Sequence, residues 1–230
     1  MSVASLDRLA AARSALSSAE MRTGVRREEI EVEGFDDGAH LTLPAALAPL
    51  TPTGTLPRGA VVQVTGSTSL LLALAGAATG EEGWCAVVAC PHLGWRAAAA
   101  AGLSVERTVV IPAPGPDAPT AIGALAEGMD VLVLGACPAL RDRDRRSLAG
   151  RLRARDALLF SHAPWPGARV TLRAEHEEPQ QLGEGLRLTV HATGRAIPGT
   201  WSSQLILGDG PPRAEPHSQA AAPARHLRAV

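Results

Sequence analysis

The feature that most constrains this chain is a regular alternation of short apolar runs and helical stretches, which begins at Gly59. Strands that alternate with helices of about ten residues form βαβ units, so the pattern predicts an α/β fold with a mostly parallel sheet flanked by helices. The apolar runs are continuous, as in strands that are covered on both faces. The expected strands are 60–64, 84–89, 108–111, 131–134 and 157–160, and the expected helices are 70–79, 95–101, 117–127 and 145–155.

The pattern changes after Phe160, where the helices stop. Strand-like runs at 169–174, 186–191 and 201–207 follow one another through turns such as Pro198-Gly199. Strands in succession predict antiparallel hairpins that extend the C-terminal end of the sheet. We therefore place the α/β domain at residues 56–208.

The two ends of the chain lack this pattern. Residues 1–55 are interpreted as an N-terminal helix and an extended lead-in, because prolines interrupt the second half of the segment. Residues 209–230 have the composition of a disordered tail. The N-terminal helix is expected at 5–20, where Leu6, Leu9 and Leu16 recur at roughly helical spacing.

Composition excludes one class of chemistry. All 22 basic residues are arginine, so no mechanism that needs a lysine is available. The net charge of −1 gives no overall attraction to nucleic acid or to an acidic membrane. No apolar run approaches the ~18 residues of a membrane helix, and no secretory signal is visible. We expect a cytoplasmic protein that does not contact membranes.

A strand, a glycine turn and an apolar helix occupy residues 60–79, which is the context of a phosphate-binding loop. The turn contains Gly66, Ser67, Thr68 and Ser69, but it is about three residues too short and has no lysine. Its hydroxyls suit an anion at the helix start, and they also suit helix capping, which we favour. We interpret the turn as a vestigial loop without a bound cofactor.

The fourth expected strand leads to the same interpretation. An aspartate that holds magnesium through water would stand at the end of 131–134, where the chain has Gly135. Asp130 lies at the opposite end of that strand and cannot replace it. We therefore expect no catalytic residue, no cofactor and no metal ion.

Short matches around these elements resemble the RecA family. Residues 56–66 (Leu-Pro-Arg-Gly-Ala-Val-Val-Gln-Val-Thr-Gly) resemble the entry strand of that family, and 146–162 resemble its helix and strand before the second DNA-binding loop. Residues 84–92, which end in Cys-Pro-His, are similar to a segment that ends in Asp-Ala-Glu-His. On this match Pro91 replaces the glutamate that activates water. The resemblance implies a RecA-like core without ATP hydrolysis or strand exchange.

Within this superfamily the chain is most similar to the small degenerate proteins of the ImuA and actinobacterial ImuA′ group. The resemblance implies a non-catalytic adaptor in SOS-induced mutagenic translesion DNA synthesis. Its implied partners are an ImuB-like relative of the Y-family polymerases and, indirectly, an error-prone DnaE-type polymerase. The alternative is a SulA-like inhibitor of cell division, which also has a RecA-like fold without a phosphate loop.

Candidate partner-binding residues come from three places in the chain. An arginine-rich stretch suits DNA phosphates or an acidic partner. Its alternating aspartates favour a self-paired, solvated face over DNA contact, and this face and a protein partner fit the pattern about equally. Tryptophans near turns are typical interface anchors, and tryptophans packed under loops are as common. The N-terminal helix suits packing on its own domain or self-association. The candidates are Arg141, Arg143, Arg145, Arg146, Trp165, Trp201, Leu6, Leu9 and Leu16.

An unrecognised enzyme site is the third alternative. His92 and His162 both follow expected strands at the carboxyl edge of the sheet, where α/β proteins bind ligands. Neither has an obvious nucleophile or carboxylate partner in the sequence. Cys85, Cys90 and Cys137 lack metal-binding spacing and are interpreted as reduced structural thiols.

Overall fold

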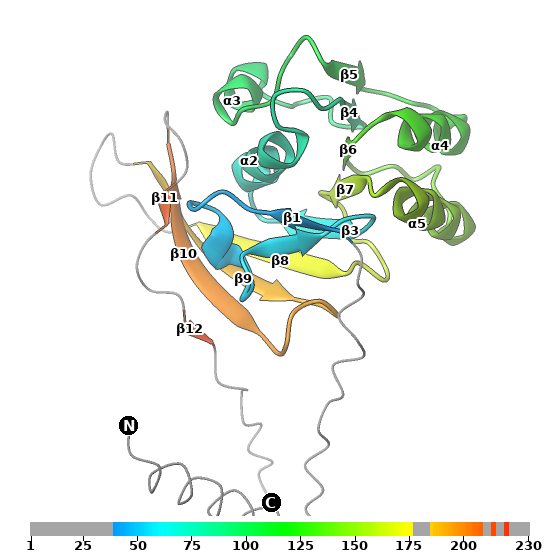
Figure 1. Cartoon of the computed structure of the whole chain (residues 1–230). Coiled ribbons are helices and arrows are strands. Elements are labelled where there is room, and N and C mark those ends of the chain that lie inside the picture. The colour runs from blue at the N-terminus through cyan, green and yellow to red at the C-terminus, as the bar shows by residue number, and fades with distance from the viewer. Residues whose placement is uncertain (1–38, 177–184, 209–212, 215–218, 221–230) are drawn as a thin grey trace, which may run out of the picture. The chain divides into compact units, whose positions relative to one another are not determined.

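The computed structural model describes residues 39–176, 185–208, 213–214 and 219–220 (Figure 1). The chain divides into two units, Met1–Asp37 and Gly38–Val230, and every described residue belongs to the second. The strands are β1 (His40–Thr42), β2 (Thr55–Pro57), β3 (Val61–Thr65), β4 (Cys85–Val88), β5 (Thr108–Ile111), β6 (Val131–Leu134), β7 (Leu158–Ser161), β8 (Val170–His176), β9 (Leu186–Thr193), β10 (Trp201–Leu207), β11 (Arg213–Ala214) and β12 (Gln219–Ala220). The helices are η1 (Ala48–Leu50), α2 (Thr68–Thr79), α3 (Trp95–Ala100), α4 (Ala118–Gly128) and α5 (Asp142–Arg155).

Within the described residues, ten strands form one sheet in the order β11-β10-β9-β8-β3-β7-β6-β4-β5, with β12 also on β10. All pairs from β8 to β5 are parallel, whereas β8–β9, β9–β10 and the pairs of β10 with β11 and β12 are antiparallel. The mixed fold with a large, mostly parallel sheet, flanking helices and C-terminal antiparallel strands is confirmed. Strand β8 joins the two parts of the sheet, because it lies parallel to β3 and antiparallel to β9.

Helices cover both faces of the sheet, as Figure 1 shows. One apolar cluster packs α2, α3 and η1 against inward residues of strands from β3 to β10, including Leu70, Val64 and Leu172. The second packs α4 and α5 against β4, β6 and β7 on the opposite face through residues such as Ile122 and Leu152. The parallel strands β4, β6 and β7 are buried along their whole length because both faces are covered.

The segment before β3 is part of this domain, so its interpretation as an extended lead-in is wrong over residues 39–55. Strand β1 pairs with β2, and η1 lies between these two strands in the sequence. Leu43, Leu47 and Leu50 are almost fully buried in the first cluster. Prolines shorten the secondary structure there, but they do not prevent the leucines from packing.

The predicted tail also takes part in the sheet at two points. Residues 213–214 and 219–220 form the short strands β11 and β12 along the outer edge of β10. The prediction of disorder is therefore wrong for these four residues. The rest of 209–230, like the predicted N-terminal helix, lies outside the described residues.

Candidate functional site

The glycine turn between β3 and α2 is built as a helix cap. Ser67 is buried and its Oγ accepts a hydrogen bond from the Leu70 N–H at 3.2 Å. A serine in this position satisfies one of the amide groups that the first helical turn leaves unpaired. Thr68 is exposed and Ser69 is half-buried. The geometry agrees with the capping interpretation of this turn.

The backbone of strand β8 packs against the same turn. Gly66 has φ of 86°, and a Cβ placed on it would lie 1.9 Å from the carbonyl oxygen of Ala174. His176 follows two residues later in β8, and its Nε2 lies 2.7 Å from the Gly66 carbonyl oxygen. The glycine is therefore required by chain packing, and the backbone of β8 lies against the turn. Local sequence pattern could not predict this contact, because the two segments are more than 100 residues apart.

The carboxyl end of β6 is closed in a similar way. Gly135 is buried, and a Cβ placed on it would lie 2.0 Å from the Ala89 carbonyl oxygen and 3.0 Å from the Cys90 Sγ. The Gly135 N–H donates to the Val88 carbonyl oxygen at 2.9 Å. No side chain fits at this point unless the ends of β4 and β6 move apart. The position expected for a magnesium-binding aspartate is occupied by the neighbouring backbone.

Asp130, at the amino end of β6, forms hydrogen bonds with the segment before β4. Its Oδ2 accepts a hydrogen bond from the Trp84 N–H at 2.8 Å. The Asp130 N–H in turn donates to the Trp84 carbonyl oxygen at 3.0 Å. This reciprocal pair joins the segment before β4 to the start of β6, at the sheet edge opposite Gly135.

A shallow cleft of about 330 Å³ lies beyond the carboxyl ends of β4, β5 and β6. None of the described side chains that line it carries a carboxylate, an imidazole or a hydroxyl, and Cys137 supplies its only thiol. Ala89 lies at its rim with φ of 57°, a conformation that alanine rarely adopts. Pro91, the residue matched to a catalytic glutamate, also lines the cleft. Apart from the Cys137 thiol, this lining offers no group that could activate water or transfer a proton.

Among the described residues, neither histidine at this edge forms a hydrogen bond or ion pair with a serine, cysteine or carboxylate side chain. His162 is exposed, and its Nδ1 lies 3.2 Å from the carbonyl oxygen of Val64. His92 is exposed in the loop after β4. In the part of the chain that the structure describes, no cluster of three His, Cys, Asp or Glu residues could hold a metal ion.

Two of the thiols are shielded. Burial raises the pKa of Cys85 to about 12, an effect that a hydrogen bond with the Thr79 side chain partly offsets. Burial also raises the pKa of Cys90, against a smaller effect of its hydrogen bond with the Gly135 backbone. A thiol that stays protonated is a poor nucleophile, which agrees with a structural role for both.

The structure separates the four candidate arginines of the α5 region into two groups. Arg145 is held in place: its Nη1 donates to the Pro164 carbonyl oxygen at 2.9 Å, and its guanidinium stacks 5.0 Å from the Trp165 ring centroid. Arg141, Arg143 and Arg146 are exposed. Only these three remain accessible to a partner.

The tryptophans differ in how far they are exposed. Trp165 is only 6% exposed beneath Arg145, so it cannot be a surface anchor. Trp201 is half-buried, and its Nε1 donates to the Pro49 carbonyl oxygen at 2.7 Å. Trp84 begins the expected strand 84–89, which should be covered on both faces, but it is 45% exposed because it precedes β4 at the amino edge of the sheet. The remaining candidates Leu6, Leu9 and Leu16 lie outside the described residues.

Comparisons with known proteins identify relatives of this domain. The model of the MT3502 N-terminal domain family matches residues 49–167. An uncharacterized protein of Mycobacterium tuberculosis, Rv3395c, is 35% identical over 135 residues. That match covers 57% of this chain and 66% of the relative, slightly under two thirds of its length. Among the described residues, no helix is long and apolar enough to cross a membrane.

Proposed function

Because the chain belongs to the MT3502 N-terminal domain family, we propose that this family's α/β domain is here a non-catalytic, RecA-like adaptor. Its task is assembly of the translesion complex of SOS-induced mutagenesis, in which it binds an ImuB-like polymerase relative. Through this ImuB-like protein the adaptor associates indirectly with an error-prone DnaE-type polymerase. The proposal combines the RecA and ImuA resemblance of the sequence with the closed geometry of the former nucleotide site.

One observation carries the non-catalytic part of the proposal. Gly135 stands where a magnesium-binding aspartate would be needed, and the Ala89 carbonyl oxygen fills the space of any side chain. Nucleotide hydrolysis depends on a metal ion that bridges phosphate oxygens and on a group that orients the attacking water. At this edge the described residues supply neither, whereas the sheet and both helical layers are intact.

The matched relative is mycobacterial, which agrees with the resemblance of the sequence to an actinobacterial group. The description of that relative names no role. The sequence resembles an actinobacterial group, and a mycobacterial protein is 35% identical to it over the matched region. A preserved fold without catalytic groups is typical of proteins that act through binding.

The experiment is a pull-down with the purified full chain and the ImuB-like protein of the same genome. We expect capture at micromolar concentrations, with no ATP hydrolysis above the rate of a sample without protein. Capture should persist without nucleotide and magnesium, because the site that would bind them is closed. Absence of binding at micromolar concentrations, or magnesium-dependent ATP turnover, would refute the proposal. Filamentous growth on overexpression, with direct binding to the division tubulin homologue, would instead support the cell-division alternative.

A further inference from the structure

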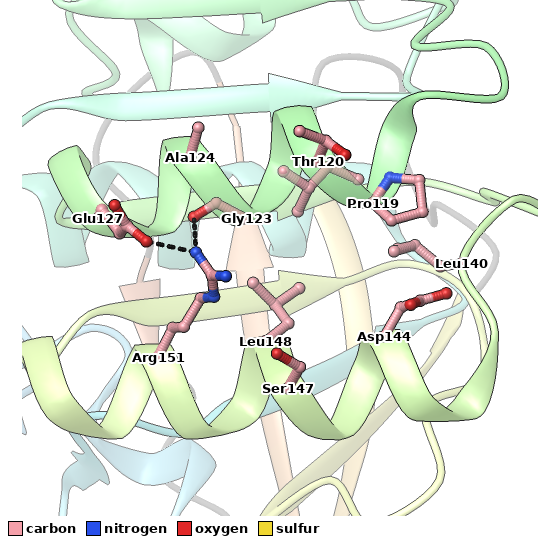
Figure 2. Close-up of a pocket in the computed structure, with 11 residues that line it drawn as sticks. Pro119, Thr120, Gly123, Ala124, Glu127, Leu140, Asp144, Ser147, Leu148 and Arg151 are labelled. Carbon is pink, nitrogen blue, oxygen red and sulfur yellow. Dashed lines mark hydrogen bonds and ion pairs between the residues drawn. The ribbon is translucent and has the colours of Figure 1, made fainter.

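The groove between α4 and α5 has a volume of about 370 Å³, but its charged groups already have partners (Figure 2). Arg151 donates through Nη1 to the Gly123 carbonyl oxygen at 3.3 Å and to the Glu127 carboxylate. Asp144, toward the other end of the groove, accepts from the Arg141 N–H at 3.0 Å. These contacts select no ligand. A buried polar group without a described partner lies instead in the edge strand β10.

The chain covers the outer edge of β10 only in part. All seven residues of this strand, Trp201–Leu207, pair with β9 on the inner side. On the outer side the tail strands β11 and β12 pair antiparallel with four of the seven, which are Trp201, Ser202, Leu205 and Ile206. The N–H and C=O groups of an edge strand can pair with another chain. The pairing with β11 and β12 shows that this edge accepts antiparallel strands.

The register of the tail strands places small residues opposite two large residues of β10. Ala220 stands opposite Trp201, and Ala214 stands opposite Leu205. Trp201 and Leu205 both pack against the first apolar cluster, and Trp201 is only half-buried. Residues directly opposite in an antiparallel pair share a face of the sheet. A branched apolar residue at either position would therefore remove more apolar area from water than an alanine does.

Ser203 lies between the two places where the tail strands pair. It is only 2% exposed, on the same face as Trp201 and Leu205, and no group of the described residues forms a hydrogen bond with its Oγ. A buried hydroxyl without a partner is destabilising. In an added strand, the residue opposite Ser203 would have its Cβ about 4.5–5.5 Å away, a distance at which threonine and serine hydroxyls bond across strands. The edge therefore favours a hydroxyl at that position.

The position of Ser203 also argues against a second copy of β10 as the occupant. Two β10 strands paired antiparallel over all seven residues would be centred on Gln204, so Leu205 would stand opposite Ser203. The serine hydroxyl would then still lack a partner. A segment with a threonine or serine and apolar residues at alternate positions meets both requirements of the edge.

We propose that the outer edge of β10 is the docking site for an extended segment of a partner protein, which displaces β11 and β12 and pairs antiparallel with β10. The segment places a threonine or serine opposite Ser203 and apolar residues opposite Trp201, Leu205 and Leu207. In such an added strand, main-chain hydrogen bonds supply the affinity and alternate side chains supply the specificity. The inference rests on the proposed function only in that an adaptor needs such a surface.

The test uses the full chain and a fluorescent peptide, Val-Arg-Val-Gln-Thr-Arg-Val, whose threonine stands opposite Ser203 when the peptide pairs with all of β10. Fluorescence anisotropy should give a Kd in the micromolar range. A peptide with valine in place of the threonine should bind about threefold to tenfold more weakly. Ser203→Ala should abolish that difference, because it removes the hydroxyl that the threonine meets. Ser202→Ala, on the opposite face of β10, is the matched control and should preserve the difference.

Methylation of the peptide backbone tests whether the peptide adds as a strand. Alternate residues of a strand direct their N–H groups to the same neighbour. Of two peptides methylated at the odd or at the even nitrogens, one should therefore bind at least about tenfold more weakly and the other nearly as well as the unmethylated peptide.

Competition by the tail is tested in the full chain. Ala214→Pro with Ala220→Pro weakens β11 and β12 and should tighten peptide binding about threefold or more. Ala222→Pro with Ala224→Pro, beyond β12, is the matched control and should leave binding unchanged. Circular dichroism should show that all these variants are folded.

Several outcomes would overturn the inference. These are equal binding of the threonine and valine peptides, equal affinities of the two methylated peptides, and no effect of the prolines in β11 and β12. Self-association of that proline variant, without peptide binding, would assign the edge to a second copy. If the ImuB-like protein is captured by the full chain although the peptide does not bind, only the edge proposal is refuted. If that capture fails while the peptides bind as expected, only the proposed function is refuted.

Discussion

The substitution Gly135→Ala tests whether the backbone after β4 leaves no room for a side chain at the carboxyl end of β6. Alanine adds the smallest side chain available. Real Cβ atoms essentially never approach closer than 3.0 Å to another heavy atom of this kind, and the added Cβ would lie 2.0 Å from the Ala89 carbonyl oxygen. The ends of β4 and β6 must therefore separate by about 1 Å. That movement stretches the hydrogen bond from the Gly135 N–H to the Val88 carbonyl oxygen, now 2.9 Å.

The expected cost follows from these two effects. Overpacking of a well-packed site costs about 1–3 kcal/mol, and a buried backbone group that loses its partner costs about 1–3 kcal/mol more. We expect the free energy of unfolding to fall by about 3 kcal/mol, which corresponds to a melting temperature about 6–12 °C lower for a domain of this size. Urea unfolding followed by circular dichroism measures the first quantity and calorimetry the second.

Gly150→Ala provides the matched control. Gly150 lies within α5, and a Cβ placed there would meet nothing within 4 Å. Alanine is the better helix former, so this substitution should stabilise the domain by about 0.5–1 kcal/mol. If Gly135→Ala unfolds at the same urea concentration as the unchanged chain, the closure of this edge is refuted. Gly135→Asp should be less stable still, because it also buries a carboxylate, and it should not acquire ATPase activity.

Three further substitutions test other parts of the structure. Ser67→Ala removes the oxygen that caps α2, so thermal melting should show a loss of about 1 kcal/mol, whereas a change at the exposed Thr68 should cost less than about 0.5 kcal/mol. Arg145→Ala removes the hydrogen bond to a loop carbonyl and the stacking on an indole; urea unfolding should show a loss of about 1–2 kcal/mol, and Arg146→Ala should be nearly neutral. The chain contains neither lysine nor tyrosine, so thiols are the side chains that titrate between pH 9 and 12. Cys85 deprotonates near 9.0 when unfolded and near 12 when folded. The unfolded state then binds fewer protons in this window, and the free energy of unfolding should fall as pH rises, by up to about 1.4 kcal/mol per unit, with a smaller slope in Cys85→Ala. An unchanged slope in that variant would contradict the assignment.

The parallel core was predictable because its strands are continuous apolar runs. Residues 108–111, 131–134 and, in the antiparallel part, 201–207 are strands with the expected bounds, and the other expected elements among the described residues differ by a few residues at their ends. Burial on both faces leaves little freedom in the choice of residues, so the strands stand out from the helices between them. The capped glycine turn was predictable for a related reason, since serine before an apolar helix is a local signal.

Burial at the margins of the sheet was not predictable from local pattern. Leu43, Leu47 and Leu50 are buried in a cluster that includes residues of β9 and β10, far along the chain, although prolines surround them. Trp165 is buried because Arg145, 20 positions earlier, covers its ring, and Trp84 is exposed because it stands just before its strand. Each case depends on a tertiary contact that composition and periodicity do not record.

The packing around two glycines bears on the proposal that this domain does not hydrolyse ATP. A missing lysine or aspartate side chain would, by itself, be reversible through one substitution at an otherwise open site. Here Gly66 and Gly135 are each in contact with a neighbouring carbonyl oxygen, of Ala174 in the first case and Ala89 in the second. A substitution cannot remove these backbone carbonyl groups, so either position can accommodate a side chain only if a strand moves. Both strands are held in place by their own ladders: β8 between β3 and β9, and β4 between β5 and β6. For the non-catalytic domain that we propose, we expect single substitutions at these glycines to lower stability without producing ATP hydrolysis.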